Sequence, residues 1–185
     1  SEILRRDTNE REQLAELACR LCGQRGVGGS SGGAERAKSA ERLASHAEAV
    51  GAHALMAIPP VATAAGEAEV VSYYRRILKA CKLPVIVQDA SGYVGRPMSI
   101  ALQAELLKEY GQRILYKPEA TPIGPRLSRL RDATDGKAKI FEGTGGISLV
   151  DSHRRGIVGT MPGADLIKGL VALWRALEAK DDDRT

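Results

Sequence analysis

The segment Ile114-Leu115-Tyr116-Lys117-Pro118-Glu119-Ala120 is the most informative part of this sequence for the fold. A short apolar run ends in a charged residue and a proline, which is typical of a buried strand that leads into a polar loop. Side chains alternate along a strand, so Leu115, Lys117 and Glu119 share one face and Tyr116 lies on the other. A lysine is therefore expected at the carboxyl end of a buried parallel strand, where α/β proteins place their active residues.

Short apolar runs alternate with helical stretches on both sides of this segment. We expect five strands, at residues 54–58, 85–87, 114–117, 139–141 and 157–158. Apolar residues at helical spacing predict helices at residues 10–22, 34–50, 67–81, 97–110, 126–134, 147–155 and 164–180. Thr8 is the expected N-cap of the first helix, with an imperfect capping box, and the glycine-rich tract 26–33 is expected to be a loop. This alternation predicts an α/β protein with a parallel sheet.

The number of strands bears on how much of a fold the chain contains. A complete (β/α)8 barrel has eight strands and about 250 residues, whereas this chain has 185 residues. We expect N-terminal strands and C-terminal helices of such a barrel to be missing from this chain, so that residues 1–185 form one partial barrel domain. The structural alternative is an open doubly wound sheet that binds a nucleotide, although the tract 26–32 follows a helix and matches a phosphate turn only weakly. Residues 143–146 follow a strand and open a helix, which makes them the better anion-binding candidate.

Composition fits an ordinary folded domain and argues against several classes of function. Hydrophobic residues make up 43% of the chain, and its 27 basic and 23 acidic residues are scattered rather than gathered in one stripe. We therefore expect no nucleic-acid partner. No apolar run approaches the roughly 18 residues that span a bilayer, and the charged first residues lack the apolar core of a signal peptide. These features predict a cytoplasmic protein with no membrane partner.

Cysteines and histidines are expected to have structural roles. The three cysteines argue against a disulfide framework and fit a reducing compartment. Cys19 and Cys22 form a C-x-x-C pair, but they lack the second pair or the spaced histidines of a zinc site. His46, His53 and His153 form no cluster with the spacing of metal ligands. We expect no metal and no cofactor.

Lys117 has two interpretations from its strand context alone. A buried ammonium is unfavourable unless it is paired, and desolvation favours the neutral amine, which is the form that attacks a carbonyl. Alternatively, Lys117 pairs with Glu119 or extends to solvent at the rim of the sheet. Both interpretations place the side chain at the carboxyl end of its strand.

The segment around Lys117 resembles the one that contains the Schiff-base lysine in the dihydrodipicolinate synthase and N-acetylneuraminate lyase family. The neighbouring segments follow in the same order. Residues 47–60 look like the family's helix, turn and strand ending in a proline pair, 83–87 like its next strand, 141–143 like its glycine-bearing strand and 156–160 like its last strand. The resemblance covers nearly the whole chain. It implies a parallel (β/α)8 barrel of the class I aldolase type and a homo-oligomer of two or four copies.

The resemblance also implies a chemistry for the site. Lys117 would attack the ketone of pyruvate or a related 2-oxo acid and form an imine, and the backbone at Gly143 would approach the bound carboxylate. The first two residues look like the tail of a family loop whose preceding hydroxyl residues, which help to bind that carboxylate, are absent from this sequence. The residues expected to bind the substrate are Gln88, Glu119, Gly143, Thr144 and Val158.

The sequence departs from the family pattern at three positions. Gln88 stands where the family commonly has a tyrosine that transfers protons, and an amide can orient a substrate or a water but cannot donate and recover a proton. Val61 stands where a second tyrosine is expected, and Tyr93 where an arginine often binds a second carboxylate. Tyr93 is the candidate to replace the missing phenol as a catalytic residue. Asp89 and Tyr116 are expected to point away from the site.

These observations predict a lyase that acts on a 2-oxo acid of the pyruvate type through an imine at Lys117. Because the proton-transfer groups differ from the family pattern, an aldolase or dehydratase of a 2-keto-3-deoxy sugar acid is as plausible as the synthase. A non-catalytic protein that binds a 2-oxo acid on the same scaffold is the alternative from another class, favoured by Gln88 and Val61. An open nucleotide-binding sheet would instead bind its ligand near residues 143–146.

Overall fold

The strands of the computed structural model, which describes residues 2–23, 25–62, 65–90 and 96–181, are all parallel to their neighbours. Four strands pair in chain order: β1 (Gly29–Ser31), β2 (Ala54–Ala57), β3 (Val85–Asp89) and β4 (Ile114–Pro118). β5 (Phe141–Glu142) and β6 (Gly159–Thr160) form a second pair, which a parallel bridge between Tyr116 and Ile140 joins to β4. The predicted α/β fold with parallel strands is confirmed.

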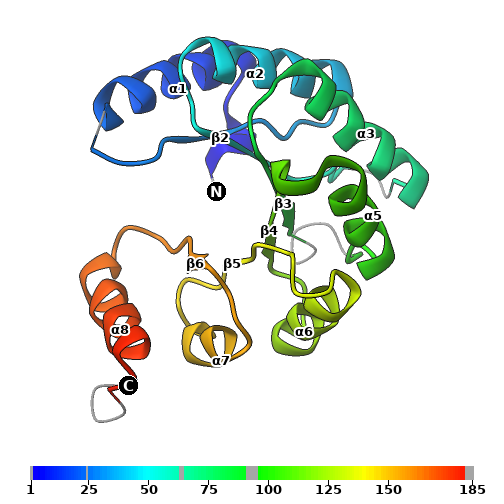
Figure 1. Cartoon of the computed structure of the whole chain (residues 1–185). Helices are drawn as coiled ribbons and strands as arrows, with labels where there is room; N and C mark the ends of the chain where they lie inside the picture. The colour runs from blue at the N-terminus through cyan, green and yellow to red at the C-terminus, as the bar shows by residue number, and fades with distance from the viewer. Residues whose placement is uncertain (1, 24, 63–64, 91–95, 182–185) are drawn as a thin grey trace.

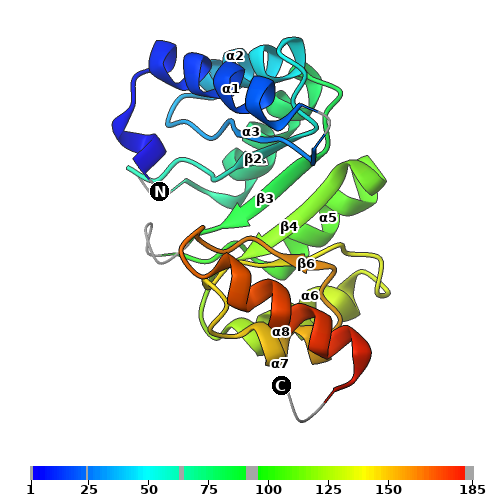
Figure 2. The ribbon, with the colours of Figure 1, turned by 90° about the vertical axis from the view of Figure 1, so that its left-hand side faces the viewer.

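Helices lie on one side of the strands and follow them in chain order (Figure 1). They are α1 (Thr8–Cys22), α2 (Ala37–Ala49), α3 (Glu67–Ala80), α5 (Ile100–Tyr110), α6 (Ile123–Ala133), α7 (Leu149–Arg154) and α8 (Ile167–Ala179). The 3-10 helix η2 (Gly111–Arg113) joins α5 to β4, whereas the 3-10 helix η1 (Glu2–Arg5) precedes α1 and lies inside the arc. The helices form an arc around the strands that is open between α1 and α8. Figure 2 shows β3 and β4 side by side and pointing the same way.

The arc ends at two strand edges. Among the described residues, β1 pairs only with β2, and β6 pairs only with β5. Apolar side chains are exposed on the two helices that border the opening, namely Leu14, Leu17 and Leu21 on α1 and Ile167 and Val171 on α8. The arrangement is that of a barrel wall that does not close within these residues.

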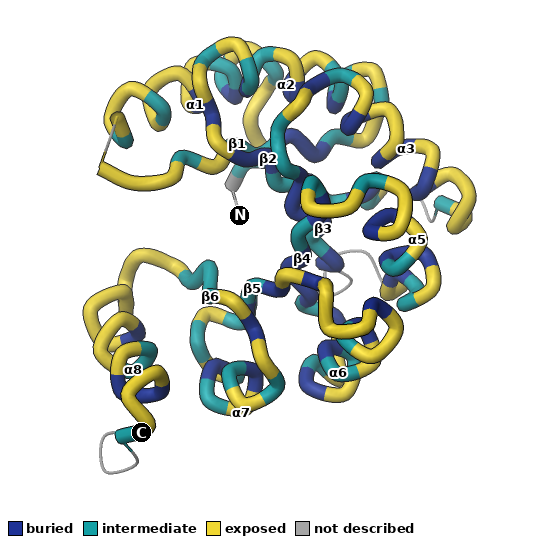
Figure 3. The backbone as a smooth tube through the Cα atoms, in the orientation of Figure 1, coloured by how far each residue is buried: buried dark blue, intermediate teal, exposed yellow. Residues whose placement is uncertain are grey.

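The core lies between the strands and the helices, where the strands are buried and the outer faces of the helices are exposed (Figure 3). Two tyrosines are fully buried there and both donate hydrogen bonds: Tyr74 Oη to the Ala57 carbonyl at 2.9 Å, and Tyr116 Oη to the Gln103 carbonyl at 2.7 Å. An unpaired buried hydroxyl would cost roughly 1–3 kcal/mol, so these bonds fix α3 and α5 against the strands.

The predicted loop at residues 26–33 is wrong, because β1 lies inside it. Gly29 pairs with Ala54 and Ser31 with Met56, and the N–H of Gly32 extends the pairing by donating to the Met56 carbonyl at 2.8 Å. An added Cβ at Gly32 would lie 2.6 Å from the Leu55 side chain. The glycines therefore allow the strand to pack closely against β2. The prediction had taken them only as a sign of a flexible loop.

The other expected elements are present with shifted ends. Four of the five predicted strands overlap observed ones, although β5 begins two residues later than predicted, at Phe141. The fifth prediction, at residues 157–158, is displaced, because β6 begins directly after it. The helix predicted from residue 97 begins at Ile100, because the Ser99 hydroxyl accepts a hydrogen bond from the Leu102 N–H and makes Ser99 the N-cap. Helix α6 starts three residues earlier than predicted, at Ile123.

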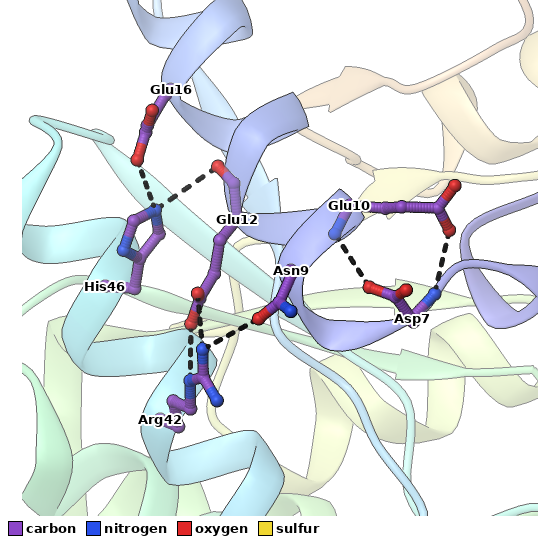
Figure 4. A network of polar contacts seen from close by, with 7 residues as sticks. All are labelled: Asp7, Asn9, Glu10, Glu12, Glu16, Arg42 and His46. Atoms are coloured by element: carbon purple, nitrogen blue, oxygen red, sulfur yellow. Dashed lines mark hydrogen bonds and ion pairs between the residues drawn. The ribbon is translucent and has the colours of Figure 1, made fainter.

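The start of α1 also differs from the prediction. Asp7, and not Thr8, is the N-cap, and the capping box is complete: Asp7 accepts from the Glu10 N–H at 2.9 Å, and the Glu10 carboxylate accepts from the Asp7 N–H at 3.0 Å (Figure 4). Farther along the same helix, Glu12 binds Arg42 of α2 through two contacts of 2.7 Å. These contacts lie on the outer surface and join the first two helices.

Candidate active site

A cavity of about 450 Å³ opens at the carboxyl ends of the strands. The carboxyl end of each strand, together with the residues directly after it, contributes two lining residues spaced two apart, as expected from the alternation of side chains. These pairs are Ser31 and Gly33, Met56 and Ile58, Gln88 and Ala90, Lys117 and Glu119, Gly143 and Gly145, and Met161 and Gly163. Ile3 of η1 and Pro162 complete the described lining. The face of β4 predicted to be functional is therefore the face that lines the cavity.

Lys117 lies in this cavity with 8% of its surface exposed. Its Nζ lies 2.7 Å from Oε1 of Glu119, so the two side chains on the same face of the strand form an ion pair. The predicted pairing of Lys117 with Glu119 is thus present, but inside the cavity. A buried ammonium without such a partner would be strongly unfavourable.

Glu119 joins a second strand to this pair. Its other oxygen, Oε2, accepts a hydrogen bond from Gln88 Nε2 at 2.9 Å, and Gln88 lies opposite Lys117 in the pairing of β3 with β4. Its backbone N–H donates to the Asp89 carbonyl at 3.1 Å, which continues the strand ladder past Pro118. Lys117, Glu119 and Gln88 therefore form one connected polar group in the cavity wall, and among the described lining residues only Lys117 and Glu119 can be charged.

Gly143 lies directly against this group. A Cβ at Gly143 would be 2.8 Å from the Glu119 side chain and 3.0 Å from Cε of Lys117. Any larger residue would therefore displace the ion pair. The backbone of Gly143 lines the cavity beside Lys117, and its expected approach to a bound carboxylate stays a prediction.

Asp89 and Tyr116 point to the other side of the sheet, as the alternation predicts. Asp89 Oδ1 accepts from the Met98 N–H at 3.2 Å, and Oδ2 lies 2.9 Å from Arg126 Nη2. Burial raises the pKa of Asp89, although the Met98 N–H and Arg126 act in the opposite direction. Burial also raises the pKa of Tyr116. Neither side chain lines the described cavity.

Two of the expected substrate-binding residues lie outside the cavity lining. The hydroxyl of Thr144 donates to Oε1 of the buried Glu142, which also accepts the Thr144 N–H at 2.6 Å. Val158 precedes β6 and is 49% exposed. Lys117, Glu119, Gln88 and Gly143 are the expected residues that the structure brings together, and Tyr93 lies outside the described residues.

Three charged residues near the site were not found from the sequence. Arg11 of α1 is buried and donates through Nη2 to the Gly33 carbonyl at 2.7 Å and the Ser31 carbonyl at 3.2 Å, at the cavity end of β1. Glu142 also accepts from the Thr160 hydroxyl at 2.8 Å and so links β5 to β6. The third is Arg126. Only Arg11 gives a local signal, because it lies one helical turn before Ala15 on the buried face of α1.

The cysteines and histidines lie apart from the cavity lining among the described residues. Cys19, Cys22 and Cys81 are free thiols, and no group of potential metal ligands gathers within the described ranges. His46 contacts the Glu12 carbonyl, while His153 contacts Glu178. No helix in the part of the chain that the structure describes is long and apolar enough to cross a bilayer. The cytoplasmic location and the homo-oligomer stay predictions.

Known proteins resemble this chain in sequence. The model of the dihydrodipicolinate synthetase family matches residues 2–115, and Lys117 follows two residues beyond the match. The chain is 30% identical over 147 residues to L-2-keto-3-deoxyarabonate dehydratase of Azospirillum brasilense, covering 74% of this chain and 46% of that protein. It is 27% identical over 123 residues to 4-hydroxy-tetrahydrodipicolinate synthase of Bartonella quintana, covering 66% of this chain and 42% of that protein. The chain thus spans about half the length of these relatives.

Solved structures place the six strands in a larger barrel. Dihydrodipicolinate synthase of Aquifex aeolicus matches 97% of this chain with a TM-score of 0.89 at 19% identity, and 61% of that chain is covered. Sialic acid aldolase of Ruminococcus gnavus matches 98% with a TM-score of 0.90 at 18% identity, and 60% of that chain is covered. These structures are (β/α)8 barrels, so the open arc is the corresponding part of one. The chain belongs to the dihydrodipicolinate synthetase family.

Proposed function

We propose that the protein is a lyase that forms an imine between Lys117 and a 2-oxo acid of the pyruvate type. The observation that supports this most directly is the position of the Lys117 Nζ, in a cavity at the carboxyl end of a parallel strand, 2.7 Å from a carboxylate. In such barrels the reacting groups lie at this end of the strands. A lysine amine there is a suitable nucleophile for a ketone.

Relatives support the class of substrate. The solved dihydrodipicolinate synthase of Acinetobacter baumannii is in complex with pyruvate, and the sialic acid aldolase of Ruminococcus gnavus has a catalytic lysine. The cavity of this chain is large enough for a small 2-oxo acid. The imine would withdraw electrons from the neighbouring carbon, which assists carbon–carbon bond formation or cleavage and the loss of water.

Trapping with borohydride tests the imine. Borohydride reduces an imine to a stable amine, so incubation with pyruvate should add the mass of a 1-carboxyethyl group to the protein. Lys117→Ala should prevent the addition, whereas substitution of the exposed Lys137 should leave it unchanged. Absence of an adduct in the wild-type protein, or an adduct that survives Lys117→Ala, would contradict the proposal. Reversible binding of pyruvate that persists in Lys117→Ala, without turnover, would favour a non-catalytic binding protein.

A dehydratase or aldolase of a 2-keto-3-deoxy sugar acid is the second candidate for the reaction that follows the imine. Gln88 favours it, because this amide lines the cavity at the position where a proton-transferring tyrosine was expected and cannot perform that step. One relative is itself a 2-keto-3-deoxyarabonate dehydratase. Turnover of 2-keto-3-deoxyarabonate, compared with condensation of pyruvate with an aldehyde, would separate the two reactions.

A further inference from the structure

We propose that Glu119 is the general acid and base of this site, in the role that Gln88 cannot take. The inference rests on the proposed imine at Lys117 and assigns the proton transfers around it. Glu119 is in contact with the reacting nitrogen, since its Oε1 lies 2.7 Å from the Lys117 Nζ. Proton transfer needs a group within hydrogen-bond reach of the reacting atom, and this contact satisfies that condition.

The surroundings of Glu119 fix one oxygen and leave the other at the nucleophile. Gln88 Nε2 donates to Oε2 at 2.9 Å, while Oε1 faces Lys117 and Gly143. Gln88 is therefore a positioning residue, which orients the carboxylate without exchanging a proton itself. The glycine at position 143 leaves the space in which this carboxylate and the lysine meet.

Other groups that could transfer protons are placed elsewhere. Within the described ranges, Glu119 is the one carboxylate that lines the cavity, and no tyrosine or histidine lines it. The four described tyrosines lie outside that lining: Tyr74 and Tyr116 donate to backbone carbonyls of the core, Tyr73 accepts from the Ala34 N–H, and Tyr110 interacts with Glu109. Asp89 faces Arg126 on the opposite side of the sheet.

The proton transfers of imine formation can be written with Glu119 as the carrier of one proton. The Glu119 carboxylate takes a proton from the Lys117 ammonium, and the neutral amine attacks C2 of the 2-oxo acid. The carbonyl electron pair moves to oxygen, which receives the second proton of the amine. Glu119 returns its proton to this hydroxyl, the C–O bond breaks, and water leaves. An ammonium and a ketone have become an iminium and water, with the carboxylate restored.

The same carboxylate can act on the iminium. It takes a proton from C3, and the electron pair of that C–H bond moves toward the iminium nitrogen to give an enamine. With a hydroxyl on C4, the enamine expels this group, and the protonated Glu119 supplies the proton with which it leaves as water. The proposal thus assigns to Glu119 both the formation of the imine and the step that follows it.

Exchange of the C3 protons of pyruvate in deuterated water tests the assignment, because this exchange requires the enamine. In the wild-type protein, proton NMR should show loss of the methyl signal. Glu119→Gln should lower the exchange rate per imine formed by roughly 10²-fold to 10⁴-fold, with the imine measured by borohydride trapping. Glu119→Ala should recover exchange when formate is added. Glu105→Gln, on the outer surface of α5, is the matched control and should exchange like the wild type.

The outcomes separate this inference from the imine itself. Wild-type exchange per imine in Glu119→Gln would overturn the role of Glu119 while leaving Lys117 as the nucleophile. Loss of exchange in Tyr93→Phe, together with normal exchange in Glu119→Gln, would transfer the role to Tyr93. Absence of any trapped imine in the wild-type protein would remove both proposals. If Glu119 had a structural role alone, its substitution would lower the amount of trapped imine and the rate of C3 exchange in parallel. Added formate would then not restore exchange in Glu119→Ala.

Discussion

Lys117 and Glu119 lie two residues apart on one face of β4 and its extension, with 2.7 Å between the Lys117 Nζ and Glu119 Oε1. The ion pair of Lys117 with Glu119 and the place of Lys117 in a cavity at the end of its strand are therefore compatible. The pair forms because residues i and i+2 of a strand project to the same side. It lies in the cavity because that side faces the interior of the arc of strands.

The space at Gly143 leads to the first prediction. Gly143→Ala places a methyl group within 2.8 Å of Glu119 and 3.0 Å of Lys117, so the ion pair must shift. A displacement of about 1 Å can lower a reaction rate by about 100-fold. We therefore expect the rate of imine trapping to fall by roughly 10-fold to 100-fold. Adding borohydride at a series of short times after pyruvate, and measuring the adduct by mass spectrometry, gives the rate of imine formation.

Gly26 supplies the control for this substitution. No atom lies within 4 Å of a Cβ placed at Gly26, so Gly26→Ala should trap the imine at the wild-type rate. Equal rates in Gly143→Ala and wild type would mean that the lysine does not need its present contact with Glu119.

Arg11 provides a prediction on stability. Its Nη2 donates to the carbonyls of Ser31 and Gly33 at the end of β1, and the side chain is buried. Arg11→Met keeps most of the apolar packing and leaves two carbonyls without this donor, so we expect a loss of about 2 kcal/mol in the free energy of unfolding. Urea denaturation followed by circular dichroism measures it. Arg42→Met, which removes a surface contact with Glu12, should cause a much smaller loss; equal losses would contradict a special role for Arg11.

The raised pKa of Asp89 leads us to expect that the stability of the fold depends on pH. Burial raises the pKa of its carboxyl, so the folded chain binds this proton more tightly than the unfolded chain does. The contribution of Asp89 to stability is therefore fully present below its unfolded pKa of about 4 and is lost as the pH rises through its higher folded pKa. The stability of the wild-type protein relative to Asp89→Asn should fall over this range in urea titrations. A relative gain with rising pH would instead show that Arg126 lowers the pKa below the unfolded value.

The sequence predicted the class of fold, and it predicted that Lys117 and Glu119 share one face of a strand end, because both depend on local patterns. Alternation on β4 put Lys117 and Glu119 on one face and Tyr116 on the other, and the strand end put the lysine at the cavity. The order of the neighbouring segments then gave the family. These inferences need only the period of a strand and the position of its carboxyl end.

What the sequence did not predict depends on contacts between distant residues. Strand β1 was missed because it consists of glycine and serine and contains no β-branched residue. Its position is set instead by pairing with β2 and by packing against Leu55. The ion pair of Asp89 with Arg126 joins residues 37 positions apart. The hydrogen bond from Gln88 to Glu119, on which the proposed acid–base role depends, follows from the register of two strands.

Peptide mapping after reduction with borohydride in the presence of pyruvate tests the imine at Lys117 most directly. Trypsin should release residues 114–126 as one peptide, because it cleaves poorly before Pro118, and this peptide contains Lys117 as its one lysine. We expect a 1-carboxyethyl group on this peptide in the wild-type protein and no modified peptide in Lys117→Ala. Modification of any other lysine in place of Lys117, or an unmodified 114–126 peptide, would contradict it.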